Sequence, residues 1–156
     1  MSLIVIGGRI LRDDKAAVLR SARRVFRASR IGDVDATLTF VLDREMRALN
    51  RRWRGKDRPT DVLSFSAWEG EPIPGDQEFV GDIVVSVETA ARQADEMGHE
   101  LHVEVAVLVA HGLLHLLGLD HERGHDEAAW QLSCELTFLA AAGIDPAAAL
   151  TARAGP

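Results

Sequence analysis

The chain has 156 residues, of which 47% are hydrophobic and 27% charged, and its formal net charge is −6. This length suits one domain over residues 1–156, and the composition is that of a globular protein. The single cysteine, Cys134, excludes an intramolecular disulfide framework and a cysteine zinc cluster, and suits a reducing compartment.

The best candidate for a transmembrane segment, Val105 to Leu119, is shorter than the required length of about 20 residues. No secretory signal is recognisable. We therefore expect a soluble cytoplasmic protein with no membrane association.

The charge is distributed unevenly along the chain. Residues 1–60 hold 15 Lys or Arg and 7 Asp or Glu, whereas residues 61–156 hold 3 and 17. A basic half is typical of proteins that bind phosphate-bearing partners. The two halves could instead pair with each other across the fold, and charge alone does not choose between these interpretations.

The hydrophobic pattern predicts both strands and helices. Four short β-rich runs predict strands at residues 3–6, 35–42, 62–65 and 82–87. Apolar residues at helical spacing predict helices at residues 13–28, 43–52, 88–97, 99–117 and 126–142, although the valines of 99–117 would also suit a strand. Asp43 is expected to be a helix N-cap, and Gly98 and Gly143 to end helices. The order predicts an α+β fold, a single domain with a small mixed four-stranded sheet packed with about five helices.

Two segments between these elements are predicted to be loops. Residues 54–60, Arg-Gly-Lys-Asp-Arg-Pro-Thr, form a basic loop because Gly55 and Pro59 interrupt regular structure. Residues 68–79 contain two glycines and two prolines and are expected to form an exposed loop.

The most informative segment is His-Gly-Leu-Leu-His-Leu-Leu-Gly-Leu-Asp-His, residues 111–121. His111 and His115 are four residues apart, so on the central helix they project from one face and can bind one ion. Gly118 can end the helix and turn the chain, so that His121 supplies a third nitrogen. Three nitrogen ligands leave a fourth position for water, as in catalytic zinc sites. The alternative is two core histidines and an unrelated one on the surface, but unpaired buried imidazoles would be costly.

The histidine spacing also matches the metzincin pattern, His-Glu-x-x-His-x-x-Gly-x-x-His, with one difference. Gly112 stands where that pattern has its glutamate general base, and no methionine follows His121 to form a Met-turn. Loss of a general base typically costs about 10²- to 10⁴-fold in rate, so hydrolysis of peptides or amides is disfavoured. A glycine at this position is also expected to leave room beside the metal for a group larger than a peptide carbonyl.

Two blocks of sequence are together more specific than either alone. The first comprises Leu49-Asn50, residues 54–65 and Gly81-Asp82-Ile83, and the second is residues 111–121. Together they resemble the YbeY family, bacterial metal-dependent endoribonucleases that mature ribosomal RNA. The chain departs from the family pattern at Asp61, where Asn is frequent, and at Ser66, where Pro is frequent.

The resemblance implies one zinc ion per chain on His111, His115 and His121, with another divalent transition metal such as nickel as an alternative. It implies that Arg54 is the catalytic arginine, whose guanidinium binds phosphate oxygens and stabilises charge on phosphorus. It also implies single-stranded regions of ribosomal RNA as substrate, in maturation and ribosome quality control. The partners would be the ribosome or ribosome-assembly proteins, in a bacterial cytoplasm.

Four more residues are candidates for the site. Lys56 and Arg58 are expected to bind substrate phosphates at the approach to the metal. Ser64 either points into the cleft and binds substrate or is a structural hydroxyl. Asp120 either orients a ligand imidazole as an outer-shell partner or caps the turn after Gly118.

The remaining polar and aromatic candidates are expected to be structural. His99, His102 and His125 are predicted to lie on the surface, Cys134 to be a buried and inert thiol, and Trp53 to anchor the core rather than to stack on a base. One exposed helix face is predicted to be solvated, although it could extend a surface for RNA, and it carries Arg20, Arg23, Arg24 and Arg27.

Two other functions stay open. One is a non-catalytic ribosome assembly factor whose metal is structural, and the other is a zincin-like metallopeptidase or amidohydrolase. Cleavage of RNA also has two routes, attack by water on phosphorus or attack by the substrate's own 2′-hydroxyl. Only the second passes through a 2′,3′-cyclic phosphate.

Overall fold

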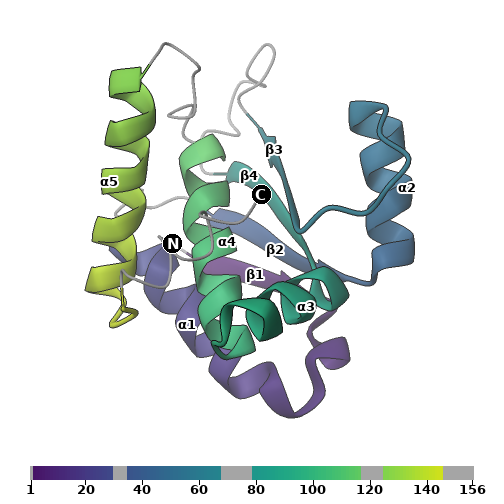
Figure 1. Cartoon of the computed structure of the whole chain (residues 1–156), viewed down its shortest axis with the longest axis horizontal. Coiled ribbons are helices and arrows are strands. Elements are labelled where there is room, and N and C mark those ends of the chain that lie inside the picture. Colours follow the sequence, from purple (N-terminus) through teal and green to yellow (C-terminus); the bar gives the residue numbers. More distant parts are fainter. Residues whose placement is uncertain (1, 30–34, 68–78, 117–124, 146–156) are drawn as a thin grey trace.

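The structure is a computed structural model that describes residues 2–29, 35–67, 79–116 and 125–145 (Figure 1). These residues form four strands and five α-helices, with one 3-10 helix, η1, after the first strand. In chain order the elements are β1 (Ser2–Ile6), η1 (Gly8–Asp14), α1 (Lys15–Ala28), β2 (Asp35–Val41), α2 (Asp43–Arg54), β3 (Val62–Ser66), β4 (Phe79–Ser86), α3 (Val87–Met97), α4 (Leu101–Leu116) and α5 (His125–Ala141).

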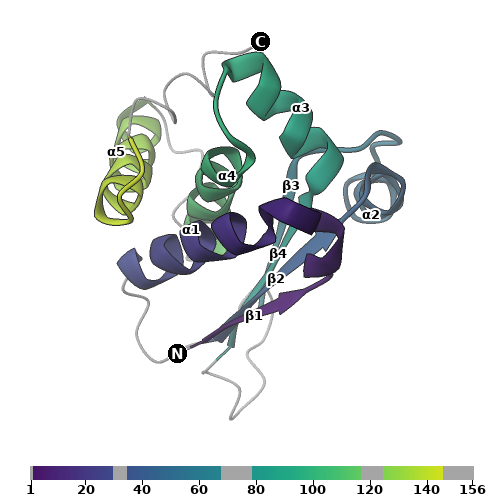
Figure 2. The ribbon, with the colours of Figure 1, turned by 90° about the horizontal axis from the view of Figure 1, so that it is seen from below.

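The four strands form one mixed sheet in the order β1-β2-β4-β3. Strands β1, β2 and β4 are parallel, and β3 pairs antiparallel with β4 at the edge of the sheet. Helices α1, α3, α4 and α5 lie on one side of the sheet, and α2 lies on the other (Figure 2). This arrangement confirms the predicted α+β class and the order of its elements.

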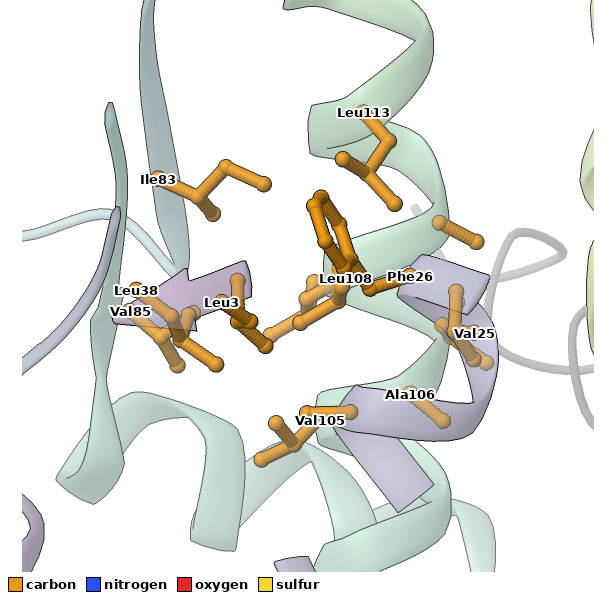
Figure 3. Packing of buried hydrophobic residues seen from close by; sticks show 14 of the residues in the cluster. Leu3, Val25, Phe26, Leu38, Ile83, Val85, Val105, Ala106, Leu108 and Leu113 are labelled. Atoms are coloured by element: carbon orange, nitrogen blue, oxygen red, sulfur yellow. The ribbon is translucent and has the colours of Figure 1, made fainter. Parts of the chain in front are cut away.

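Helix α4 is the centre of the main core. Its residues from Val105 to Ala110 are all buried, and it packs against both α1 and the sheet. Figure 3 shows Leu108 and Leu113 of α4 facing Phe26 of α1 and Ile83 of β4. Full burial of one such side chain contributes about 1.5–3 kcal/mol. α4 is apolar on nearly all sides, so its sequence lacks the polar stripe that marks an amphipathic helix. For this reason the sequence pattern alone was also compatible with a β-strand.

The start of α2 differs from the prediction. The helix begins at Asp43 and its N-cap is Leu42, so the prediction of Asp43 as the cap is wrong. The Asp43 carboxylate instead accepts hydrogen bonds from Ser86, Thr89 and Arg92, at 2.6, 2.6 and 2.8 Å. These bonds tie the start of α2 to the start of α3, which a local capping rule does not anticipate.

The predicted helix ends agree with the structure where it describes them. Gly98 follows α3 with φ 71°, and Gly143 lies two residues beyond the end of α5 with φ 78°. The predicted break at Gly118 lies outside the described residues, as does the predicted loop at residues 68–79 except for Phe79, which begins β4. Among the helices of the described ranges, none has the length and apolar character needed to span a membrane.

Candidate metal centre and cleft

A cleft of about 270 Å³ lies between α4, β3 and the ends of α2 and α3. The predicted residues Arg54, Ser64, His111 and His115 all line it. Its other lining residues are Thr60, Asp61, Val62, Gln93, Glu104, Val107 and Leu108. Residues from distant parts of the sequence therefore meet at the position where the histidine spacing predicted a site.

The two histidines of α4 face each other across one helical turn. Their Nε2 atoms are 2.8 Å apart, and the ring centroids are 4.4 Å apart at an interplanar angle of 71°. This is the geometry expected of side chains at i and i+4 on one helix face. The pair therefore presents two converging imidazole nitrogens to the cleft.

A buried carboxylate of α5 fixes the orientation of His111. Glu135 is 1% exposed, and its Oε1 lies 2.8 Å from His111 Nδ1. A carboxylate only accepts hydrogen bonds, so we assign the proton to Nδ1 of His111, which donates a hydrogen bond to Glu135. The Nε2 atom of a neutral His111 then has its lone pair directed toward His115. Carboxylates that hold metal-binding histidines in this way are a common feature of zinc sites.

These residues fit a transition metal with imidazole ligands. Zinc in proteins is commonly bound by histidine nitrogens at about 2.0–2.1 Å, and two such nitrogens converge here with one imidazole already oriented. Within the part of the chain that the structure describes, no group of three His, Cys, Asp or Glu residues could hold an ion. The predicted third ligand, His121, and its neighbour Asp120 lie outside the described residues.

Gly112 brings α4 into close contact with the sheet. A Cβ atom at this position would lie 3.0 Å from Ser64 Oγ and 3.1 Å from a methyl carbon of Ile83. The space is therefore filled by the sheet, and the expectation that Gly112 leaves room beside the metal is wrong.

Arg54 reaches the cleft from the end of α2. Gly55 follows with φ 69°, a left-handed conformation that ends the helix and turns the chain into the basic loop. Asn50, which is 2% exposed, donates a hydrogen bond from Nδ2 to the Arg58 carbonyl at 2.8 Å and so holds the loop against α2. A bidentate pair between Arg47 and Asp57 spans the same loop.

The basic loop borders a second hollow of about 390 Å³, which Lys56 and Arg58 line. This hollow shares Arg54, Asp61 and Gln93 with the cleft, so the two adjoin each other. The structure thus places the predicted phosphate-binding residues beside the cleft that contains the histidines.

The wall of the cleft formed by α3 and α4 carries a buried carboxylate. Glu104 of α4 is 3% exposed and lies 2.6 Å from His99 Nε2. With its amide nitrogen turned toward the carboxylates, Gln93 donates to Glu104 Oε1 at 3.0 Å and to Asp61 Oδ2 at 3.2 Å. Burial raises the pKa of Glu104, and the negative charge of Asp61 adds to the increase, while the hydrogen bond from His99 opposes it. This wall is therefore acidic, and Arg54 lines the same cleft from the end of α2.

Two expectations about individual side chains are wrong. The side chain of His99 is only 14% exposed and pairs with the buried Glu104, so it is no surface histidine. His102 is half-exposed at 27% and lies beside Ser21 and the exposed Glu100. Trp53 is 59% exposed and is no core anchor. The side chain of His125 lies outside the described residues, and Cys134 is half-buried with a pKa raised by burial.

The sequence analysis missed Glu104, Gln93 and Glu135. For both glutamates the sequence contained an indication of burial, because each carboxylate lies among apolar residues at helical spacing. Glu135 lies between Leu132 and Leu139 on α5, and Glu104 lies seven residues before His111 on α4. Gln93 had no such signal, because its role depends on two carboxylates from other elements.

Comparison with known proteins agrees with the two sequence blocks. Residues 12–135 match the model of a protein family described as Endoribonuclease YbeY. The chain belongs to the YbeY family. It is 49% identical over 111 residues to the Endoribonuclease YbeY of Pelotomaculum thermopropionicum, covering 69% of this chain and 72% of that protein. It is 42% identical over 125 residues to that of Aquifex aeolicus, covering 80% of each.

Other similar proteins match over different shares of their length. The Endoribonuclease YbeY of Picosynechococcus is 55% identical over 91 residues, which cover 56% of this chain and 56% of that protein. The solution structure of TM1509 from Thermotoga maritima is 26% identical and has a TM-score of 0.53, over 89% of this chain and 90% of that one. The predicted resemblance to the YbeY family is thus confirmed.

We expect His115→Ala to lose the metal ion, because at most two predicted ligands then stay in place. Elemental analysis of the purified variant measures the loss. The matched control is His102→Ala, the same change at the other end of α4 and outside the cleft, which should keep one ion per chain. One equivalent of metal at unchanged affinity in His115→Ala would remove this residue from the ligand set.

We expect Glu135→Ala to weaken metal binding by about 10- to 100-fold, because His111 loses the acceptor that orients it. Glu135→Gln should retain part of the affinity, since its amide oxygen can accept the same hydrogen bond. Competition with a chromogenic chelator measures the affinity, and Thr137→Ala, an exposed change on the same helix, is the control. Equal affinities for wild type and Glu135→Ala would contradict the orienting role.

Proposed function

We propose that this cleft cleaves phosphodiester bonds in single-stranded regions of ribosomal RNA, during ribosome maturation and quality control. As a member of its family the chain is an endoribonuclease, a metal-dependent hydrolase that acts on RNA. The observation that carries the proposal is that Arg54, from the end of α2, lines the same cleft as His111 and His115. A guanidinium beside a pair of metal-binding imidazoles suits a negatively charged phosphodiester.

His111, His115 and His121 would hold one zinc ion, and another divalent transition metal such as nickel would suit the same nitrogen ligands. When bound, such an ion lowers the pKa of water from 15.7 to about 7 and stabilises negative charge on phosphoryl oxygens. Glu135 supports this set by keeping His111 in one tautomer. Asp120 would either orient a further imidazole or cap the turn before His121.

The chain's own residues bind and orient the phosphodiester. Arg54 would donate two parallel hydrogen bonds to the scissile phosphate and stabilise the charge that develops there. Lys56 and Arg58 line the adjoining hollow and would hold neighbouring phosphates. Ser64 lines the cleft from β3, and its hydroxyl would donate to the substrate.

The acidic wall would restrict how the RNA enters. Glu104 lies seven residues before His111, which corresponds to about 10 Å along the helix axis. Its carboxylate would repel phosphate, so the RNA backbone would follow the basic loop rather than this wall. The ribosome, or a particle in assembly, would present the single strand in this orientation.

We expect Arg54→Ala to keep the metal and the fold but to lose about 10²- to 10³-fold in RNA cleavage, because one preorganised donor to the transition state is missing. Arg54→Lys should rescue only part of the rate, since an ammonium lacks the bidentate geometry. Cleavage of a labelled single-stranded RNA measures the rate. The control is Arg44→Ala, which removes an exposed arginine from the other end of α2. Full activity of Arg54→Ala would exclude Arg54 from the mechanism.

RNA binding should depend strongly on salt if the basic loop binds phosphates. For single strands, log K falls with log salt by about 0.7 per phosphate neutralised, so three or four contacts give a slope of roughly −2 to −3. Removal of Lys56 or Arg58 should make the slope shallower by about 0.7 and weaken all RNA sequences alike. Titrations at several salt concentrations measure the slope, with Arg20→Ala on α1 as the control. An unchanged slope in both loop variants would mean that the loop faces away from the RNA.

A further inference from the structure

Trp53 is an aromatic side chain held in place at the surface. It is 59% exposed, more than any other large hydrophobic residue that the structure describes. Its ring meets that of Phe65 in a T-shaped contact, with centroids 5.9 Å apart at 65°, and the Arg52 guanidinium carbon lies 5.1 Å from its ring centroid. Phe65 is itself half-buried against the second core cluster, formed by Val41, Met46, Leu63 and Val84. The indole is therefore held by contacts with Phe65 and Arg52, while much of its surface faces solvent.

Both members of the aromatic pair, Trp53 and Phe65, are next in sequence to residues that line the cleft. Trp53 directly precedes Arg54, and Phe65 directly follows Ser64, and both neighbours line the cleft. Alternation along β3 directs Ser64 to the cleft face of the sheet and Phe65 to the face that α2 covers. β3 is the edge strand of the sheet, and α2 lies beside it (Figure 1). The aromatic pair and Ser64 of the cleft therefore lie on opposite faces of the same edge strand.

The surroundings of Trp53 are strongly basic. Exposed cations occur on the last turn of α2 and in the loop that follows, at Arg51, Arg52, Arg54, Lys56 and Arg58. The one carboxylate in this stretch, Asp57, is paired with Arg47. Proteins that bind single-stranded nucleic acid without sequence preference combine such a positive surface with aromatic side chains on which bases stack.

We propose that Trp53 is a stacking platform for a nucleobase of the RNA single strand as it passes from the cleft over the edge of the sheet at β3. This inference rests on the proposed function, because it takes the strand in the cleft to be RNA. Arg52 and Phe65 keep the indole in position, so little side-chain freedom is lost on binding. The platform is sequence-tolerant, since every base has a π-face, and it requires unpaired bases.

The test is binding of a fluorescein-labelled single-stranded RNA, followed by fluorescence anisotropy in the presence of a chelator that prevents cleavage. Trp53→Ala should weaken binding roughly fivefold to 150-fold, the effect of losing one stacked base. Trp53→Phe should retain most of the affinity, because it keeps an aromatic face. The matched control is Trp130→Ala, which removes a 48% exposed tryptophan from α5 and should bind as wild type does.

A second measurement does not depend on the folding of the Trp53 variants. The chain has three tryptophans, so in a Trp68→Phe/Trp130→Phe variant Trp53 is the only one, and single-stranded RNA should quench its fluorescence. Duplex RNA of the same sequence should not. Unchanged binding by Trp53→Ala, equal losses in the Ala and Phe variants, or no quenching would each overturn the proposal. If RNA binds through Trp53 but is not cleaved when metal is present, the proposed function fails and the platform stands.

Discussion

The close packing of α4 on the sheet at Gly112 determines where the site forms. A Cβ at this position would lie 3.0 Å from Ser64 Oγ and 3.1 Å from a methyl carbon of Ile83, closer than most such contacts, so glycine suits this approach of the helix to the sheet. His111 precedes Gly112 and His115 lies one turn further, so both lie beside this contact with β3. The basic loop that follows Arg54 leads directly into β3, and the cleft forms where the strand and the helix meet.

Two buried glutamates stabilise this arrangement in different ways. Glu135 and Glu104 are 1% and 3% exposed, and each lies within hydrogen-bonding distance of a histidine. A buried carboxylate without a partner would be strongly destabilising, so both pairs are needed for the fold. The two pairs differ in which imidazole nitrogen of the histidine remains available to bind a metal ion or substrate. His111 uses Nδ1 toward Glu135 and keeps Nε2 for the cleft, whereas His99 uses Nε2 for Glu104 and so stabilises the wall.

The sequence predicted what depends on local pattern and missed what depends on tertiary contact. Periodicity was sufficient for the order of elements, and the spacing of His111 and His115 was sufficient to place both imidazoles on one helix face. The cap at Asp43 was mispredicted because Ser86, Thr89 and Arg92, which occupy its carboxylate, come from elsewhere in the chain. Trp53 was predicted to be buried for a similar reason. Its one aromatic partner among the described residues, Phe65, comes from β3, so the pattern of α2 alone does not show how much of the indole is exposed.

The uneven charge of the chain becomes informative once the cleft is known. The bidentate pair of Arg47 lies within the basic half, and Arg92 of the acidic half pairs with Asp43 of the basic half. Neither pair matches a first-half cation with a second-half carboxylate. The exposed charges of Arg54, Lys56 and Arg58 instead line the cleft and the adjoining hollow, where Asp61 lies among them, and Glu104 lines the cleft but not the hollow. At physiological salt the potential of such charges extends about 8 Å from the surface. Under the proposed function, this distribution would favour a strand that follows α2 and its loop, with its phosphates at Arg54 and its bases toward the sheet edge.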